Sequence, residues 1–266
     1  MQKLSVLLPA YNEETKIIEC LESVKWADEI LVVDSYSTDK TLDIVRKYGA
    51  RIIHHEYINS AKQKNWAIPQ CKYEWVLQMD ADERLEPALQ VEIKSVLENQ
   101  LPDVDGYRIN FKHHLLGKWI RHSGHYPEYH LRLFRRDVGR FQNREVDAHV
   151  IVPGRVVTLK NHILHFGTES ISQRLRTIDR YSRYEADERE KQGRSFSWFS
   201  IIFRPAAAFL YYFIYKLGFL DGMRGLLIAV LKADFVFWTY AKLWEKQIRY
   251  PTSVLRAKTW TEVGKK

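Results

Sequence analysis

The sequence predicts an α/β fold built on a parallel sheet, and three observations lead to this prediction. Short segments of strand character at 4–9, 29–34, 51–55 and 75–79 alternate with stretches whose apolar residues recur at helical spacing. The first two segments are almost continuously apolar, as expected of strands that are covered on both faces. Polar residues directly follow the first, second and fourth segments. Because ligands of such sheets bind beyond the carboxyl ends of the strands, we expect a site there.

The stretches between these segments predict helices. Apolar residues recur at helical spacing over 17–24 and over 42–48, where Gly49 marks an end. A short helix is expected within 59–69, and a longer one begins near Pro87. Strand and helix alternate closely enough for parallel connections with helices on both faces of the sheet.

The composition is that of a folded, basic protein. The 266 residues are 45% hydrophobic and 28% charged, enough for one large domain and an appendage. Two cysteines offer no disulfide framework, which is typical of a reducing compartment, and we expect no signal peptide. The net charge of +8 indicates an anionic partner, either nucleic acid, an anionic membrane surface or a phosphorylated substrate. No nucleic-acid recognition motif is present, so we do not expect that partner.

Asp80 and Asp82 follow the fourth strand. In an extended backbone their side chains would point the same way, and two carboxylates so close together favour a bound cation. Mg²⁺ or Mn²⁺ suits oxygen ligands and completes its shell with phosphate oxygens, which indicates a nucleoside diphosphate. The alternative is that residues 80–83 only cap the helix near Pro87.

The polar residues at the ends of the other strands also favour a nucleotide diphosphate as the ligand. No glycine-rich dinucleotide fingerprint follows the first strand and no P-loop is present, which disfavours those two classes. Asp34 can accept a hydrogen bond from a ribose hydroxyl or a base N–H. Lys62 or Lys64 can neutralise a pyrophosphate.

Four motifs together resemble the family 2 inverting glycosyltransferases. They are LLPAYNEE at 7–14, VVDSYSTD at 32–39, AKQKN at 61–65 and MDADE at 79–83. The resemblance implies a Rossmann-like nucleotide-diphospho-sugar transferase domain of the GT-A type, with an Asp-x-Asp motif that binds a divalent metal, Mg²⁺ or Mn²⁺.

The resemblance also implies roles for individual residues. The nucleotide-sugar donor would be held by Pro9, Ala10, Tyr11, Glu13, Asp34, Lys62, Asp80 and Ala81. The metal would be bound by Asp82 and Asp80, with His165 as a further candidate for the metal or the diphosphate.

Two further strands are expected at 106–111 and 129–136, joined by a basic and aromatic loop. Aromatic faces stack on sugars and arginines bind phosphate, so Tyr126, Arg132 and His149 are candidates for contacts with acceptor or phosphate. The alternative is a solvated loop.

Residues 143–149 (NREVDAH) are the predicted source of a general base. Inverting transfer needs one group to deprotonate the acceptor hydroxyl. Glu145 and Asp147 share one face of an extended segment, and His149 follows them. Related enzymes often show Val-His-Glu here, so this chain departs from their pattern. We favour Asp147, then Glu145, against the alternative of an ordinary charged edge strand.

The C-terminal part differs in composition. A charged helix is expected over 170–192, followed by apolar, aromatic runs at 206–215 and 225–240. Neither run is long and uncharged enough to predict a transmembrane helix. Their Trp, Tyr and Phe content between Lys and Arg favours an interfacial helix, against helices that pack on the sheet or on a second copy. Segments 204–205, 218–222 and 242–245 loosely resemble enzymes that glycosylate lipopolysaccharide cores.

We therefore expect a nucleotide-sugar-binding and catalytic domain at 1–168 and a helical, membrane-associating region at 169–266. The predicted activity is metal-dependent, inverting transfer of a sugar from a UDP-sugar to a lipid-linked or lipopolysaccharide-core saccharide. It would occur at the cytoplasmic face of the membrane, with self-association through the C-terminal helices as an option. The alternatives are a nucleotidyltransferase and a non-catalytic membrane-bound scaffold with the same fold.

Overall fold

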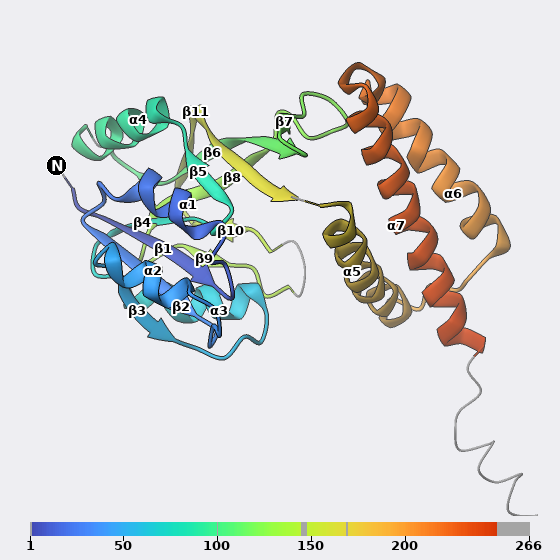
Figure 1. The fold of residues 1–266 in the computed structure, drawn as a ribbon, viewed down its shortest axis with the longest axis horizontal. Coiled ribbons are helices and arrows are strands. Elements are labelled where there is room, and N and C mark those ends of the chain that lie inside the picture. The colour runs from blue at the N-terminus through green and yellow to red at the C-terminus, as the bar shows by residue number, and fades with distance from the viewer. Residues whose placement is uncertain (1, 100, 145–147, 169, 249–266) are drawn as a thin grey trace, which may run out of the picture. The chain divides into compact units, whose positions relative to one another are not determined.

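The computed structural model describes residues 2–99, 101–144, 148–168 and 170–248 (Figure 1). The chain forms two compact units, 1–169 and 170–266. The elements of the first unit are β1 (Leu4–Ala10), α1 (Ile17–Val24), β2 (Glu29–Asp34), α2 (Thr41–Lys47), β3 (Arg51–His54), α3 (Ser60–Ala67), η1 (Ile68–Gln70), β4 (Trp75–Gln78), β5 (Glu83–Leu85), α4 (Pro87–Glu98), β6 (Val104–Leu115), β7 (Lys118–Trp119), β8 (Tyr129–Arg135), β9 (Arg140–Phe141), β10 (Val150–Ile151) and β11 (Arg155–Thr168).

A mixed central sheet organises the first unit. Its strand order is β3-β2-β1-β4-β8-β6-β11-β5, with β7 paired to β6, and β9 and β10 form a separate small sheet. The first four strands are parallel, as predicted. The short strand β8 then runs antiparallel between β4 and β6, and β5 runs antiparallel to β11. The parallel run β3-β2-β1-β4 therefore ends at β4, where the predicted site begins, and β6 and β11 pair in parallel again further along the sheet.

Two hydrophobic clusters cover the two faces of the sheet. Leu4, Val6 and Leu8 pack with buried residues of α1, α2 and α4. Leu7 and Leu31 point to the opposite face and pack with α3, η1 and the β9–β10 pair. Successive side chains of a strand alternate between faces, so β1 contributes to both clusters. The burial explains why its sequence is almost continuously apolar.

The second unit is helical, with α5 (Ile171–Lys191), α6 (Trp198–Leu210), η2 (Tyr211–Tyr215), η3 (Gly218–Asp221) and α7 (Met223–Ile248). Leu243 of α7 is buried together with Ala186 of α5. The predicted α/β fold with C-terminal helices is confirmed.

One segment of this unit is longer than the sequence suggested. Pro205 lies inside α6 without ending it, and η2 continues the helix, so the apolar stretch joins residues 198–215. Trp198–Tyr215 is long and apolar enough to cross a membrane by length and composition alone, with a mean hydropathy of 1.2, and 6% of it is buried.

Candidate functional site

The two aspartates after β4 lie in a turn and not in an extended strand. The backbone N–H of Glu83 donates to the carbonyl of Asp80 at 3.0 Å, which closes the turn. The Glu83 carboxylate in turn accepts from the N–H of Asp80 at 2.9 Å. The expectation that Asp80 and Asp82 project from one extended strand is therefore wrong, because the chain reverses here to form β5.

The Asp80 carboxylate is surrounded by donors. Its Oδ1 atom lies 2.9 Å from Lys64 Nζ and accepts from Gln78 Nε2, also at 2.9 Å. Its Oδ2 atom lies 3.5 Å from the guanidinium of Arg132. Burial raises the pKa of Asp80, but the charges of Lys64 and Arg132 outweigh burial and hold that pKa well below its usual range. Asp80 is thus a fixed anion in the site.

The buried Glu83 contacts both Asp80 and Arg132. Its side chain is buried, and Oε1 accepts from Arg132 at 2.6 Å. Burial raises the pKa of Glu83 to about 7, although the Arg132 charge opposes the shift. One guanidinium therefore ties together Gln78, Asp80 and Glu83, from three positions around the turn.

Asp82 faces the histidine that the resemblance singled out. Asp82 Oδ2 lies 3.5 Å from His165 Nε2, and His165 Nδ1 lies 2.8 Å from His113 Nδ1. Strand pairing causes this convergence, since β11 places His165 opposite Glu83 of β5 and opposite His113 of β6. Burial raises the pKa of Asp82, but the hydrogen bond with His165 outweighs it and lowers that pKa. Burial lowers the pKa of His165, but the hydrogen bond with Asp82 and the charge of Asp82 outweigh burial and raise that pKa above its usual value.

These residues fit a divalent metal ion. A methyl group on Gly167 would lie 2.6 Å from His165 Nε2 and 3.2 Å from Asp82 Oδ2, so the glycine leaves space beside both donor atoms. A carboxylate and an imidazole suit Mn²⁺, and Mg²⁺ also keeps few protein ligands. Among the described residues no group of three His, Cys, Asp or Glu side chains could hold a metal ion. The remaining ligands would be phosphate oxygens or water. Asp80 fits less well, because cations already cover both its oxygens.

The ends of β1 and β2 form a second part of the site. The Asp34 carboxylate is buried, accepts from the N–H of Ser37 at 3.1 Å and lies 3.1 Å from His54 Nδ1. Asn12 accepts from the N–H of Thr38 at 2.8 Å, which links the two loops. These loops follow adjacent parallel strands, whose carboxyl ends meet at one edge of the sheet.

The other predicted donor residues lie around this edge. Pro9 and Ala10 belong to β1, the Tyr11 ring is exposed, Glu13 precedes α1, and Ala81 is buried in the turn. Lys62 is exposed on α3, whereas Lys64 of the same helix is buried against Asp80. The sequence left open which of these two lysines meets an anion, and the structure brings Lys64 to the aspartate.

The three residues predicted to contact the acceptor or a phosphate do not form one cluster. Arg132 belongs to the Asp80 and Glu83 cluster. The hydroxyl of Tyr126 lies 3.2 Å from His162 Nε2, and the exposed His149 stacks on His130 at a centroid distance of 5.6 Å. The predicted bases Glu145 and Asp147 lie outside the described residues.

Sequence reasoning missed a carboxylate among the histidines. Glu128 lies 2.9 Å from His113 Nε2 and 2.8 Å from His130 Nε2. Burial raises the pKa of Glu128, but its two imidazole neighbours hold that pKa well below its usual range. The histidine-rich loop was visible in the sequence, but the pairing of β6 with β8 that gathers these side chains was not.

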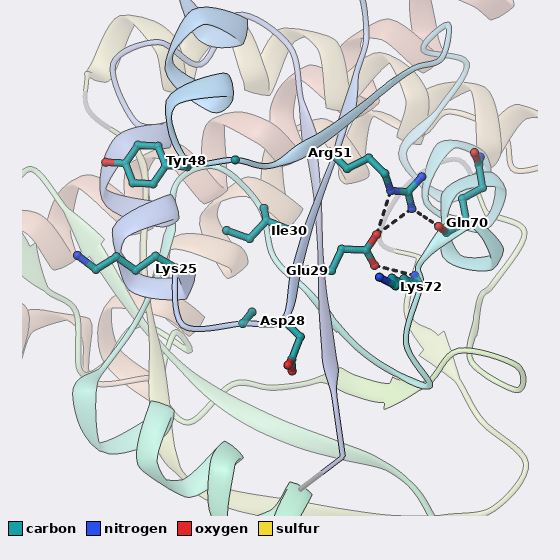
Figure 2. A pocket seen from close by; sticks show the side chains of 10 residues that line it. Lys25, Asp28, Glu29, Ile30, Tyr48, Arg51, Gln70 and Lys72 are labelled. Atoms are coloured by element: carbon teal, nitrogen blue, oxygen red, sulfur yellow. Dashed lines mark hydrogen bonds and ion pairs between the residues drawn. The ribbon is translucent and has the colours of Figure 1, made fainter.

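A hollow of ≈ 570 Å³ lies elsewhere, at the start of β2 and β3 (Figure 2). Part of its charged lining is already engaged, since Glu29 lies 2.9 Å from Arg51 and Asp28 accepts from the backbone N–H of Leu4. It lies at the opposite strand ends from Asp34 and Asp80 and takes no part in the site.

Comparison with known proteins identifies the family of the chain. The model of the family described as Glycosyl transferase family 2 matches residues 5–159, more than half of the chain. The lipopolysaccharide core biosynthesis glycosyltransferase LpsC of Rhizobium meliloti (strain 1021) is 28% identical over 91% of this chain and 92% of its own. The uncharacterized glycosyltransferase RT0209 of Rickettsia typhi is 29% identical over 94% of this chain and 89% of its own.

Solved structures are more distant. Staphylococcus aureus TarS 1–349 in complex with UDP-GlcNAc is 20% identical, with a TM-score of 0.48, over 89% of this chain and 81% of its own. Glucosyl-3-phosphoglycerate synthase from Mycobacterium tuberculosis with Mn²⁺ and UDP is 21% identical, with a TM-score of 0.36, and the match covers 42% of this chain and 44% of that one. The family match, which includes the aspartate turn and most of the sheet, decides the identity. The chain belongs to glycosyl transferase family 2 and is a glycosyltransferase.

Proposed function

We propose that this glycosyltransferase moves a sugar from a UDP-sugar to a saccharide acceptor with inversion, in a single displacement that uses a divalent metal. The observation that carries the proposal is the pairing of Asp82 with His165 beside the space left by Gly167. Next to it, Asp80 is held as an anion by two cations. The nucleotidyltransferase and scaffold alternatives are set aside, since the chain belongs to a glycosyltransferase family.

The nucleoside is proposed to bind at the ends of β1 and β2. Asp34 is a buried carboxylate beside the exposed Tyr11 and Tyr36 rings of the two loops. A carboxylate accepts from ribose hydroxyls or a base N–H, and an aromatic ring can stack on a base. Pro9, Ala10 and Glu13 complete this proposed donor contact, and Lys62 approaches the diphosphate from α3.

Asp82 and His165 are proposed to hold the metal ion, with Asp80 nearby toward the ribose or the metal. When bound, Mg²⁺ or Mn²⁺ would stabilise the negative charge of the leaving diphosphate. Arg132 keeps Asp80 in place, because the same guanidinium also binds the buried Glu83. The protein thus orients its carboxylates before the donor arrives.

Asp147 is proposed to deprotonate the acceptor hydroxyl, with Glu145 as the second candidate. Direct displacement requires this base on the face opposite the leaving group, and an α-linked donor would then give a β-linkage. Tyr126 and His149 are proposed for contacts with acceptor or phosphate.

The acceptor is proposed to be a lipopolysaccharide-core or other lipid-linked saccharide. The similarity to LpsC over most of both chains supports this class. A lipid-linked acceptor would place the reaction at the inner face of the cell membrane, where UDP-sugars are available.

The test is release of UDP from a panel of UDP- and GDP-sugars with Mn²⁺ or Mg²⁺, for the wild type and for Asp82→Asn. We expect release from one UDP-sugar, stimulated by an acceptor saccharide and lost both in the variant and with EDTA. Calorimetry with UDP and Mn²⁺ provides a second readout that needs no acceptor. Full activity in EDTA would overturn the metal role, and binding of GDP but not UDP would overturn the proposed donor.

A further inference from the structure

The α6–η2 segment presents exposed apolar side chains to its surroundings. Phe199, Ile202 and Phe203 of α6 are each at least 54% exposed, and Ile214 and Tyr215 of η2 at least 53%. On soluble proteins, exposed apolar side chains usually lie singly, whereas a continuous apolar patch marks an interaction surface. We call these residues, with those of the following turn, the apolar face.

Helical spacing places the apolar face on one side of α6. Positions 199, 202 and 203 recur at three to four residues, the spacing of one helix face. Ser200 is buried instead, and Ile201 packs against the cluster of Ala186, Tyr240 and Leu243 between α5 and α7. The helix therefore already has a partner on its inner side, and the outer side is apolar as well.

The turn between η2 and α7 extends the face. Leu217, Phe219, Leu220 and Met223 are 45%, 47%, 57% and 76% exposed. Figure 1 shows α6 and α7 running alongside each other and joined by this turn. The apolar face thus continues from the helix onto the turn.

Cations lie over tyrosine rings along the same helices. Lys216 Nζ lies 5.5 Å from the ring centre of Tyr211, and Lys232 Nζ lies 5.3 Å from that of Tyr212. The guanidinium of Arg204 lies 5.2 Å from the ring centre of Tyr240. Tyrosine and tryptophan beside Lys and Arg are enriched at the level of lipid headgroups.

The charge of the chain is divided unequally between its two units. Residues 170–266 contain 18 Lys and Arg against 9 Asp and Glu, a net charge of +9. Residues 1–169 contain 23 against 24, a net charge of −1. The whole positive excess therefore belongs to the unit that carries the apolar face. Anionic lipids attract such a unit, whereas a second copy would bring another +9 and be repelled.

We infer that the apolar face docks in the plane of an anionic lipid membrane. A spanning arrangement is disfavoured, because α7 packs on α6 and carries Lys232, Asp234 and Lys242, which are costly in hydrocarbon. In-plane docking buries only the outer side of α6 and leaves these charges out of the hydrocarbon. The purpose of docking rests on the proposed lipid-linked acceptor, but its test is independent of catalysis.

The experiment is cosedimentation of the full chain with vesicles. One set contains phosphatidylglycerol and phosphatidylcholine in equal parts, and the other contains phosphatidylcholine alone. We expect binding to the anionic vesicles that weakens with added salt, and little binding to the neutral ones. The double variant Phe199→Ser/Phe203→Ser should bind at least about tenfold more weakly, because it removes two exposed aromatic side chains from the apolar face.

The matched control is Ile18→Ser/Val91→Ser, which removes two exposed apolar side chains from the first unit and should bind as the wild type does. Thermal melts check that both variants fold. Equal vesicle binding by wild type and the Phe variant would overturn the inference. So would a wild-type dimer that this variant makes monomeric without any vesicle binding, or a chain that resists alkaline extraction from cell membranes. UDP release, measured without vesicles, reports on the proposed transfer separately.

Discussion

Lys64 Nζ lies 2.9 Å from Oδ1 of Asp80, and the lysine side chain is 8% exposed. Lys62, two residues earlier on the same helix, is exposed. The two lysines of one motif therefore have different surroundings. Lys64 compensates the charge of the aspartate turn within the protein, and Lys62 is the residue proposed to contact the diphosphate.

Lys64→Met and Lys62→Met should separate these roles. Removing Lys64 takes one donor from the Asp80 carboxylate, which keeps Arg132 and Gln78, so Lys64→Met should lower the free energy of unfolding by about 1–3 kcal/mol. Lys62→Met should change it by less than about 0.5 kcal/mol. UDP titrations should instead find weaker binding in Lys62→Met. Equal losses of stability in denaturant titrations of the two variants would contradict the assignment.

The lysine pair illustrates what the sequence can and cannot predict. Apolar segments such as 4–9 and 29–34 encode burial locally, so the parallel part of the sheet and the family resemblance could be read directly. Pairing of β5 and β6 with β11 is a long-range event that brings His165 to Asp82, and pairing of β6 with β8 gathers Glu128 among the histidines. Likewise, the turn at 80–83 depends on a buried Glu83, which an assumption of extended backbone could not anticipate.

Gly167→Ala should weaken metal binding while the protein stays folded. The added methyl group would come within 2.6 Å of His165 Nε2 and crowd Asp82, so the two proposed ligands must move. We expect Mn²⁺ affinity, measured in the presence of UDP by calorimetry, to fall by about tenfold. Gly154→Ala is a matched control, since its methyl group would meet Asp105 Oδ2 at 2.4 Å, away from the site. Equal metal affinity in the two variants would argue against the Asp82 and His165 site.

Glu83→Gln should change how stability depends on pH in the metal-free protein. Burial raises the pKa of Glu83 from 4.5 to about 7, so the folded state holds a proton that the unfolded state has released between these values. This group's contribution to stability is therefore present below about pH 4.5 and is lost as the pH rises to about 7. Relative to the variant, the wild type should lose about 3 kcal/mol across this window. Parallel curves from denaturant titrations at several pH values would show that Glu83 does not titrate there.

Asp147→Asn and Glu145→Gln should identify the base. A general base acts on the acceptor and not on the donor, so its loss should lower kcat by about 10²–10⁴ while UDP affinity stays unchanged. We expect this split for Asp147→Asn and a smaller fall for Glu145→Gln, measured with the acceptor saccharide.

Glu128→Gln tests the carboxylate that the structure adds, which is held anionic between His113 and His130. Its strongly lowered pKa makes Glu128 a weak base, so its loss should act through the position of His113 and its neighbour His165. Weaker Mn²⁺ binding in Glu128→Gln, together with a kcat that excess metal restores, would show that Glu128 acts by positioning these histidines. A fall in kcat that excess metal does not restore would instead make Glu128 the base in place of Asp147.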